Sequence, residues 1–238
     1  SSKKSEWLAL RKARTEGAPM DDPAWGRSVL TQPSAIATVQ TFADEIGALK
    51  VFDAGDVQSN GFQINADRNP FQTITESGAS FMGFAGSALL SAAAADDPRY
   101  MIAFSGDGSF MMNPQILVDA AVHKAHAMVV VFDNRRMGAI SSLQMAQYHH
   151  DFGTNDDVAV DFVAMANAVS GVKGVFGGYS VAELKTALCE AYAHEGLSLI
   201  HVPVFWGEVP MAGMDAYGRW NVGPWVEEVE RAYAGQEI

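Results

Sequence analysis

The chain has 238 residues, of which 48% are hydrophobic and 18% charged, so it carries enough apolar side chains for one sizeable core. A formal net charge of −12 argues against a nucleic-acid partner, because affinity for a phosphate backbone comes from clustered Lys and Arg. The single cysteine, Cys189, excludes a disulfide framework, a cysteine-based zinc site and an iron–sulfur cluster within the chain. It lies in a helix-like segment, where we expect a core or half-buried thiol. No apolar stretch reaches the roughly 18 residues of a membrane span and no signal core is present, so we expect a cytoplasmic protein.

Residues 1–33 are polar and proline-containing, with one helix-like piece near residues 7–14, and are predicted to form an arm or linker. From residue 34 to 238 helix-like and strand-like segments alternate, which predicts one domain. Strands are expected at residues 50–54, 71–75, 100–105, 127–133, 172–176 and 198–205. Helices are expected at residues 34–48, 80–95, 114–125, 161–170 and 181–194, the third starting at Pro114 with Asn113 as its cap. The predicted fold is α/β: a doubly wound, mainly parallel sheet of about six strands with helices on both faces.

Two polar clusters follow buried strands of this predicted sheet. Gly106, Asp107, Gly108 and Ser109 come after one strand, and Asp133-Asn134 ends the next. Such clusters meet at the carboxyl edge of a parallel sheet, where ligands bind. The glycines allow the backbone to approach an anion such as a diphosphate, and Asp107 and Asn134 supply the hard oxygen ligands that Mg²⁺ prefers. The alternative is an ordinary tight turn and a polar strand end.

The spacing of these clusters resembles the thiamine-diphosphate (ThDP) binding motif of pyruvate decarboxylase, acetolactate synthase and their relatives. The resemblance implies ThDP and Mg²⁺ as cofactors, with Asp107, Asn134 and the backbone carbonyl of Arg136 as metal ligands. The family usually has Asn-Asn where this chain has Asp133-Asn134. The departure falls on the residue that is not the usual ligand, so the metal assignment stands.

Three further segments are similar to cofactor-binding segments of that family. Ser80 and Met82 match the segment that places an apolar side chain under the cofactor, although a core methionine is the simpler reading. A second segment resembles a loop that touches the diphosphate, and a third continues the metal motif over the phosphates; either could be only a turn. Their residues are Gly55, Asp56, Val57 and Gln58, and then Met137, Gly138 and Ala139.

A narrower resemblance links the chain to the trihydroxycyclohexanedione hydrolases of inositol catabolism and to cyclohexane-1,2-dione hydrolase. It rests on four segments: residues 131–134, 140–145, 152–154 and 217–223.

The resemblance implies one subunit of a ThDP- and Mg²⁺-dependent lyase or carboligase that acts on a 2-oxo acid or a 1,2-diketone. Because complete enzymes of this type are more than twice as long, we expect the activating Glu on a separate pyrimidine-binding chain in an α2β2 assembly. A simple 2-oxo acid decarboxylase subunit and a non-catalytic regulatory subunit that binds ThDP are alternatives. A nicotinamide-binding domain is disfavoured, since no Gly-x-Gly-x-x-Gly follows the first strand.

Candidate substrate contacts are weaker. Gln144 is a possible one, with a structural role as its alternative. His149, His150 and Asp151 could be an acid–base cluster or a solvated loop. The sequence leaves open whether Arg135, His149 or His150 touches the substrate.

Overall fold

The computed structural model describes residues 2–76, 78–154 and 158–205. The strands are β1 (Met20–Asp22), β2 (Arg27–Thr31), β3 (Leu49–Phe52), β4 (Thr73–Thr75), β5 (Met101–Gly106), β6 (Ala127–Asp133), β7 (Lys173–Phe176) and β8 (Leu197–Phe205). The helices are α1 (Ser2–Thr15), α2 (Gln32–Glu45), α3 (Asp56–Ile64), α4 (Phe84–Ala88), α5 (Ser91–Ala94), α6 (Asp107–Phe110), α7 (Ile116–His123), α8 (Gly138–Tyr148), α9 (Phe162–Asn167) and α10 (Val181–Tyr192). The segment at residues 217–223, which carries part of the narrower resemblance, lies outside the described residues.

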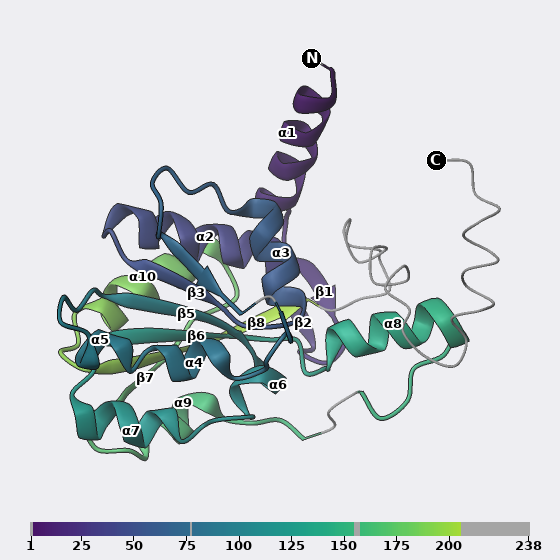
Figure 1. Ribbon diagram of the computed structural model, residues 1–238. Helices are drawn as coiled ribbons and strands as arrows, with labels where there is room; N and C mark the ends of the chain where they lie inside the picture. Colours follow the sequence, from purple (N-terminus) through teal and green to yellow (C-terminus); the bar gives the residue numbers. More distant parts are fainter. Residues whose placement is uncertain (1, 77, 155–157, 206–238) are drawn as a thin grey trace.

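The strands form one sheet in the order β1-β2-β8-β6-β5-β3-β4, with β7 also paired to β8. Pairing is parallel throughout the described sheet except between β1 and β2. Helices cover both faces, as Figure 1 shows: α2 and α10 lie on one side and α4, α7 and α9 on the other. All six predicted strands are present, and the predicted α/β fold class is confirmed.

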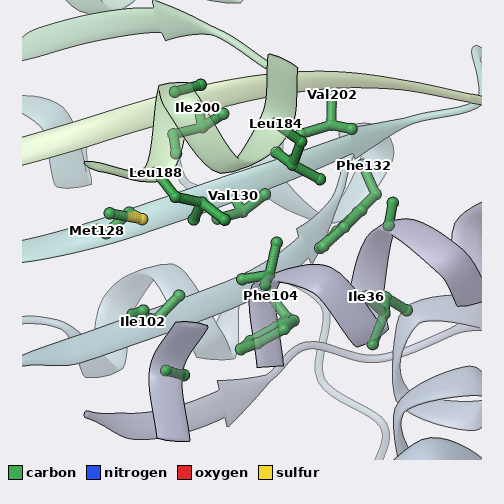
Figure 2. Close-up of a cluster of buried hydrophobic side chains, with 14 of the residues drawn as sticks. Ile36, Ile102, Phe104, Met128, Val130, Phe132, Leu184, Leu188, Ile200 and Val202 are labelled. Atoms are coloured by element: carbon green, nitrogen blue, oxygen red, sulfur yellow. The ribbon is translucent and has the colours of Figure 1, made fainter. Parts of the chain in front are cut away.

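The core divides into two layers because side chains of a strand point alternately to its two faces. On one face, Phe104 stacks on Phe52 at 4.4 Å between ring centroids and lies 6.0 Å from Phe132. Figure 2 shows this layer, where the β5, β6 and β8 side chains meet α2 and α10. The intervening residues of the same strands, such as Val129, pack on the other face. Burial on both faces explains why these strands read as continuous apolar runs.

The N-terminal region is more than the expected arm. Beyond α1, residues 27–31 form β2, which pairs with β8 through Leu30 and Thr31, and β1 adds to its far edge. Leu30 is fully buried, and the expected boundary at residues 33 and 34 lies inside α2. The sequence signal was weak because only the last three residues of this short strand are buried.

Several local expectations need correction. The helix expected over residues 80–95 is two short helices, α4 and α5. Helix α7 begins at Ile116 rather than at Pro114, and the Asn113 side chain donates to Ser87 Oγ at 2.7 Å instead of capping it. Cys189 is exposed, because it follows the buried Leu188 and so points about 100° away from the packed stripe of α10.

The expected helices also omitted α3 and α8, both of which matter for the site. Among the helices of the described ranges, none has the length and apolarity to cross a membrane. The cytoplasmic location stays a prediction.

Candidate active site

The two polar clusters meet at the carboxyl edge of the sheet. Gly106 of β5 pairs in register with Phe132 of β6, so Asp107 and Asp133 emerge side by side. Burial, and then the charge of Asp133, raises the pKa of Asp107 to about 8. Two carboxyl groups held this close favour a cation between or beside them.

A cavity of about 270 Å³ lies at this edge. Every residue predicted to bind the cofactor or the metal lines it: Gly55, Asp56, Val57, Gln58, Ser80, Met82, Gly106, Asp107, Gly108, Ser109, Asn134, Arg136, Met137, Gly138 and Ala139. The structure therefore brings together segments that lie up to 84 positions apart in the chain, from residue 55 to residue 139.

The cavity walls suit a metal-bound diphosphate. Helices α3 and α8 both begin at the cavity and have no side-chain cap. The Gly138 N–H of α8 donates to the Arg136 carbonyl at 2.9 Å, and the amides that follow it in the first turn are left for an anion, as are those of α3. A methyl group on Gly108 would collide with the Met137 sulfur, so the Met137 side chain would have to move from its place in the cavity wall. Asp107 and Asn134 present side-chain oxygens to the cavity. Asn134 Oδ1 accepts the Arg136 N–H at 3.1 Å, which fixes the turn from residue 134 to residue 136.

Asp53, which the sequence analysis did not single out, holds the cavity walls in place through buried hydrogen bonds. Its Oδ1 accepts the N–H of Gly83 at 2.9 Å, and its Oδ2 accepts the hydroxyl proton of Ser105 at 2.6 Å. Burial raises the pKa of Asp53, and these hydrogen bonds oppose the rise. Because Gly83 follows Met82 and Ser105 precedes Gly106, one carboxylate ties two walls of the cavity together.

Asp133, which stands where the family usually has Asn, holds a second set of hydrogen bonds near the cavity. Its Oδ2 lies 2.8 Å from His201 Nε2, and its Oδ1 accepts the Arg135 N–H at 2.8 Å. Arg135 has a left-handed backbone with φ of 53°. Its guanidinium lies 3.9 Å from the ring centre of Trp25 and donates to the Ala24 carbonyl at 2.8 Å. The segment at residues 133–135 is thereby held to β8 and to the β1–β2 turn.

The weaker candidates lie away from the cavity. Gln144 is not in its lining; the Gln144 amide accepts the Phe152 N–H at 2.9 Å and donates to the Phe152 carbonyl at 3.2 Å. His149 and His150 are exposed, with His149 ending α8 in a left-handed conformation. Gln144 therefore lies on α8 and contacts the segment that folds back after it, while His149 and His150 lie at the exposed end of that helix.

Asp151, by contrast, contacts Arg136, on the segment that joins β6 to α8, and Ser141 of α8. It accepts from Ser141 Oγ at 2.6 Å and pairs with Arg136 at 3.2 Å. The Ser141 hydroxyl, and then the Arg136 charge, lowers the pKa of Asp151. This carboxylate anchors the end of the loop to the start of α8.

Six further residues line the cavity: Gln32, Ala54, Ser59, Phe132, Ile140 and Leu143. Gln32 opens α2, in the region read as an arm, and its Oε1 accepts from Asn60 Nδ2 at 2.6 Å. No local pattern marks it, since its place depends on the pairing of β2 with β8.

An α/β sheet whose carboxyl edge carries paired oxygen donors and two uncapped helix starts defines a nucleotide-like or diphosphate cofactor domain. Comparison with known families makes this specific: residues 53–202 match the profile described as "Thiamine pyrophosphate enzyme, C-terminal TPP binding domain". The chain belongs to this family of thiamine-diphosphate enzymes.

Individual relatives agree with this assignment. The chain is 31% identical over 223 residues to 3D-(3,5/4)-trihydroxycyclohexane-1,2-dione hydrolase 1 of Bacillus cereus, covering 88% of this chain and 33% of that protein. It is 29% identical over 219 residues to the hydrolase of Bacillus subtilis (strain 168), covering 87% and 33%. The chain thus spans about a third of the curated relatives that it matches. The predicted resemblance to this family is confirmed.

Solved structures share the fold. Benzoylformate decarboxylase from Polynucleobacter necessarius superposes with a TM-score of 0.65 at 21% identity, covering 79% of this chain and 35% of that one. A thiamine diphosphate-dependent 4-hydroxybenzoylformate decarboxylase from Rhodococcus jostii RHA1 gives a TM-score of 0.68 at 21% identity, covering 80% and 35%.

Proposed function

We propose that this chain is the diphosphate- and metal-binding part of a ThDP- and Mg²⁺-dependent lyase or carboligase that acts on a 2-oxo acid or a 1,2-diketone. The observation that carries the proposal is one cavity lined by all fifteen predicted cofactor and metal residues. The similarity to dione hydrolases favours a 1,2-diketone substrate.

The metal would be held by the loops after β5 and β6. Asp107 and Asn134 offer side-chain oxygens, and Arg136 offers a backbone carbonyl. The raised pKa of Asp107 is what a carboxyl arranged for a cation would have before the cation binds, because a metal removes the cost of ionising it. Mg²⁺ would neutralise diphosphate charge as well.

The remaining walls would bind and orient the cofactor. First-turn amides of α3 and α8 would receive the diphosphate, and Met82, held in place through Gly83 and Asp53, would support the rings. When bound, ThDP supplies a nucleophilic ring carbon that cleaves or forms a carbon–carbon bond next to a carbonyl group. The chain's contribution is therefore position, charge balance and exclusion of water.

We further propose that the activating Glu comes from a separate pyrimidine-binding chain in an α2β2 assembly. Among the described residues that line the cavity there is no glutamate, and the carboxyl groups are those of Asp56 and Asp107. Phe81, beside the lining, and Ile140, within it, are 66% and 46% exposed, as expected of a rim that a partner covers.

Calorimetric titration tests the proposal. The purified chain, with and without a pyrimidine-binding chain, is titrated with ThDP in Mg²⁺ and in EDTA. Binding that requires Mg²⁺, tightens with the partner and is lost in Asp107→Ala supports it. The absence of ThDP binding in every combination refutes it. Turnover of a diketone or 2-oxo acid by the assembled complex separates an enzyme from a non-catalytic ThDP-binding subunit.

A further inference from the structure

Asp56 is a carboxyl group without a partner at the wall of the cavity. It is the first residue of α3, and its Oδ1 is enclosed by protein with no hydrogen-bond partner. Within the part of the chain that the structure describes, no hydrogen bond or ion pair reaches this side chain. An enclosed carboxylate without a donor or a cation is costly, and such a group relieves the cost by taking up a proton.

Helix α1 sets two cations against α3, where Arg11 donates to the Ile64 carbonyl and Arg14 to Asn60 Oδ1. Within the described residues, no ion pair joins Asp56 to either of them or to another cation.

The other ionisable residues of the cavity lining are Asp107 and Arg136. Asp107, after β5, carries the same charge as Asp56 and is the expected metal ligand. Arg136, after β6, is paired with Asp151. The lining residues contributed by α2, α8 and the segment at residues 80–82 have no ionisable side chain.

The expected occupant makes ionisation of Asp56 still less favourable. Asp56 stands on the same uncapped first turn of α3 whose amides face the anion site. A diphosphate there would set acceptor oxygens against the carboxyl group, and only the protonated form of Asp56 can donate a hydrogen bond to them. Burial alone already raises the pKa of Asp56 to about 7, so protonation near neutral pH costs little.

We propose that Asp56 is a neutral carboxylic acid in the filled site and donates its proton in a hydrogen bond to the diphosphate of the cofactor. Cofactor binding then takes up a proton wherever Asp56 is ionised in the free protein. This inference rests on the proposed function, and it assigns Asp56 a protonation state and a donor role.

The consequence is a pH dependence of known sign. Above the pKa of the free protein, the fraction of protonated Asp56 falls, so affinity for ThDP falls with it, by about fiftyfold between pH 7 and pH 9. Asp107 acts in the opposite direction, because Mg²⁺ displaces the Asp107 proton and the affinity of the site for Mg²⁺ therefore rises with pH. A substitution at Asp56 removes its own contribution and leaves that of Asp107, so the two can be measured separately.

Asp56→Asn is the informative variant, since an amide N–H replaces the acid O–H but does not titrate. ThDP is titrated into wild type, Asp56→Asn, Asp56→Ala and the exposed control Asp96→Asn, in buffers of different ionisation enthalpy at pH 7 to 9. Mg²⁺ is kept at one concentration, so that proton release from Asp107 and the ionisation of ThDP are common to all four proteins.

We expect wild type and Asp96→Asn to take up nearly one proton more than Asp56→Asn at pH 8. We also expect Asp56→Asn to bind at least as tightly as wild type at pH 9, and Asp56→Ala to bind at least tenfold more weakly than Asp56→Asn. Equal proton uptake in wild type and Asp56→Asn, with ThDP still bound, overturns the inference alone. Absence of Mg²⁺-dependent binding in wild type and Asp96→Asn overturns the proposed function, and the inference with it.

Discussion

Replacing Asp53 by alanine tests whether its buried hydrogen bonds stabilise the cavity walls. The substitution leaves three buried donors without the carboxylate: the Ala54 N–H at 3.1 Å, the Gly83 N–H at 2.9 Å and the Ser105 hydroxyl at 2.6 Å. An unsatisfied buried donor costs about 1–3 kcal/mol, and the Ser105 hydroxyl can turn toward the Gly106 carbonyl, 3.3 Å away, to recover part of this. We therefore expect the free energy of unfolding to fall by about 2–4 kcal/mol.

Asp53→Asn is the matched control. Its carbonyl oxygen can still accept from Gly83, and its amide can donate to Ser105 if the hydroxyl reverses its role. It also removes the cost of a buried charge, because burial raises the pKa of Asp53 in the folded protein. We expect its stability to lie within about 1 kcal/mol of wild type.

Urea denaturation followed by circular dichroism measures both variants, and an unchanged slope shows that the midpoint reports stability. ThDP affinity adds a second reading: Asp53→Ala loosens Met82 against Gly106 and weakens binding even where the variant is fully folded. An Asp53→Ala protein as stable as wild type, or an Asp53→Asn protein as unstable as Asp53→Ala, would refute the reasoning.

Three further predictions follow from the site. First, the raised pKa of Asp107, about 8 in the folded protein against 3.8 for the free side chain, means that metal-free wild type loses stability as pH rises through that window. Metal-free Asp107→Asn lacks this loss, so its thermal midpoint exceeds that of wild type increasingly up to pH 8; equal pH profiles contradict this. Second, His201→Ala leaves buried Asp133 without its 2.8 Å partner, and we expect about 2–4 kcal/mol less stability by chemical denaturation, with His201→Gln recovering part of it. Third, Gly108→Ala sets a methyl against the Met137 sulfur, so we expect about tenfold weaker ThDP binding, or about 1.4 kcal/mol, by calorimetry. Adding Met137→Ala to that variant restores binding, and no restoration would argue against this cause.

Much of the fold was predictable because its signals are local. Strands β5, β6 and β8 lie between two helical layers, so the run at residues 128–132 is apolar without interruption and marks a buried strand directly. The short β2 was missed, since three buried residues give no comparable pattern. Helices α3 and α8 were missed because Gly55 and Gly138, which stand at their starts, are typical turn residues.

The exposure of single side chains was harder to predict. Cys189 lies on a helix of the predicted length, but its position one residue after Leu188 turns it to solvent. Gln144 has a side chain suited to a substrate contact. Its amide is instead satisfied by the backbone of Phe152, a pairing that depends on how the loop folds back.

The sequence by itself determined the α/β class, the strand ends that carry polar residues, and the oxygen donors Asp107 and Asn134, because these follow from apolar periodicity and from motifs within a few residues. Only the tertiary structure decided what supports them. The partners of Asp53, Asp133 and Gln32 lie 30, 68 and 28 positions away in the chain. Such pairings depend on the order of strands in the sheet, where β2, β8 and β6 become neighbours although their sequence positions are far apart.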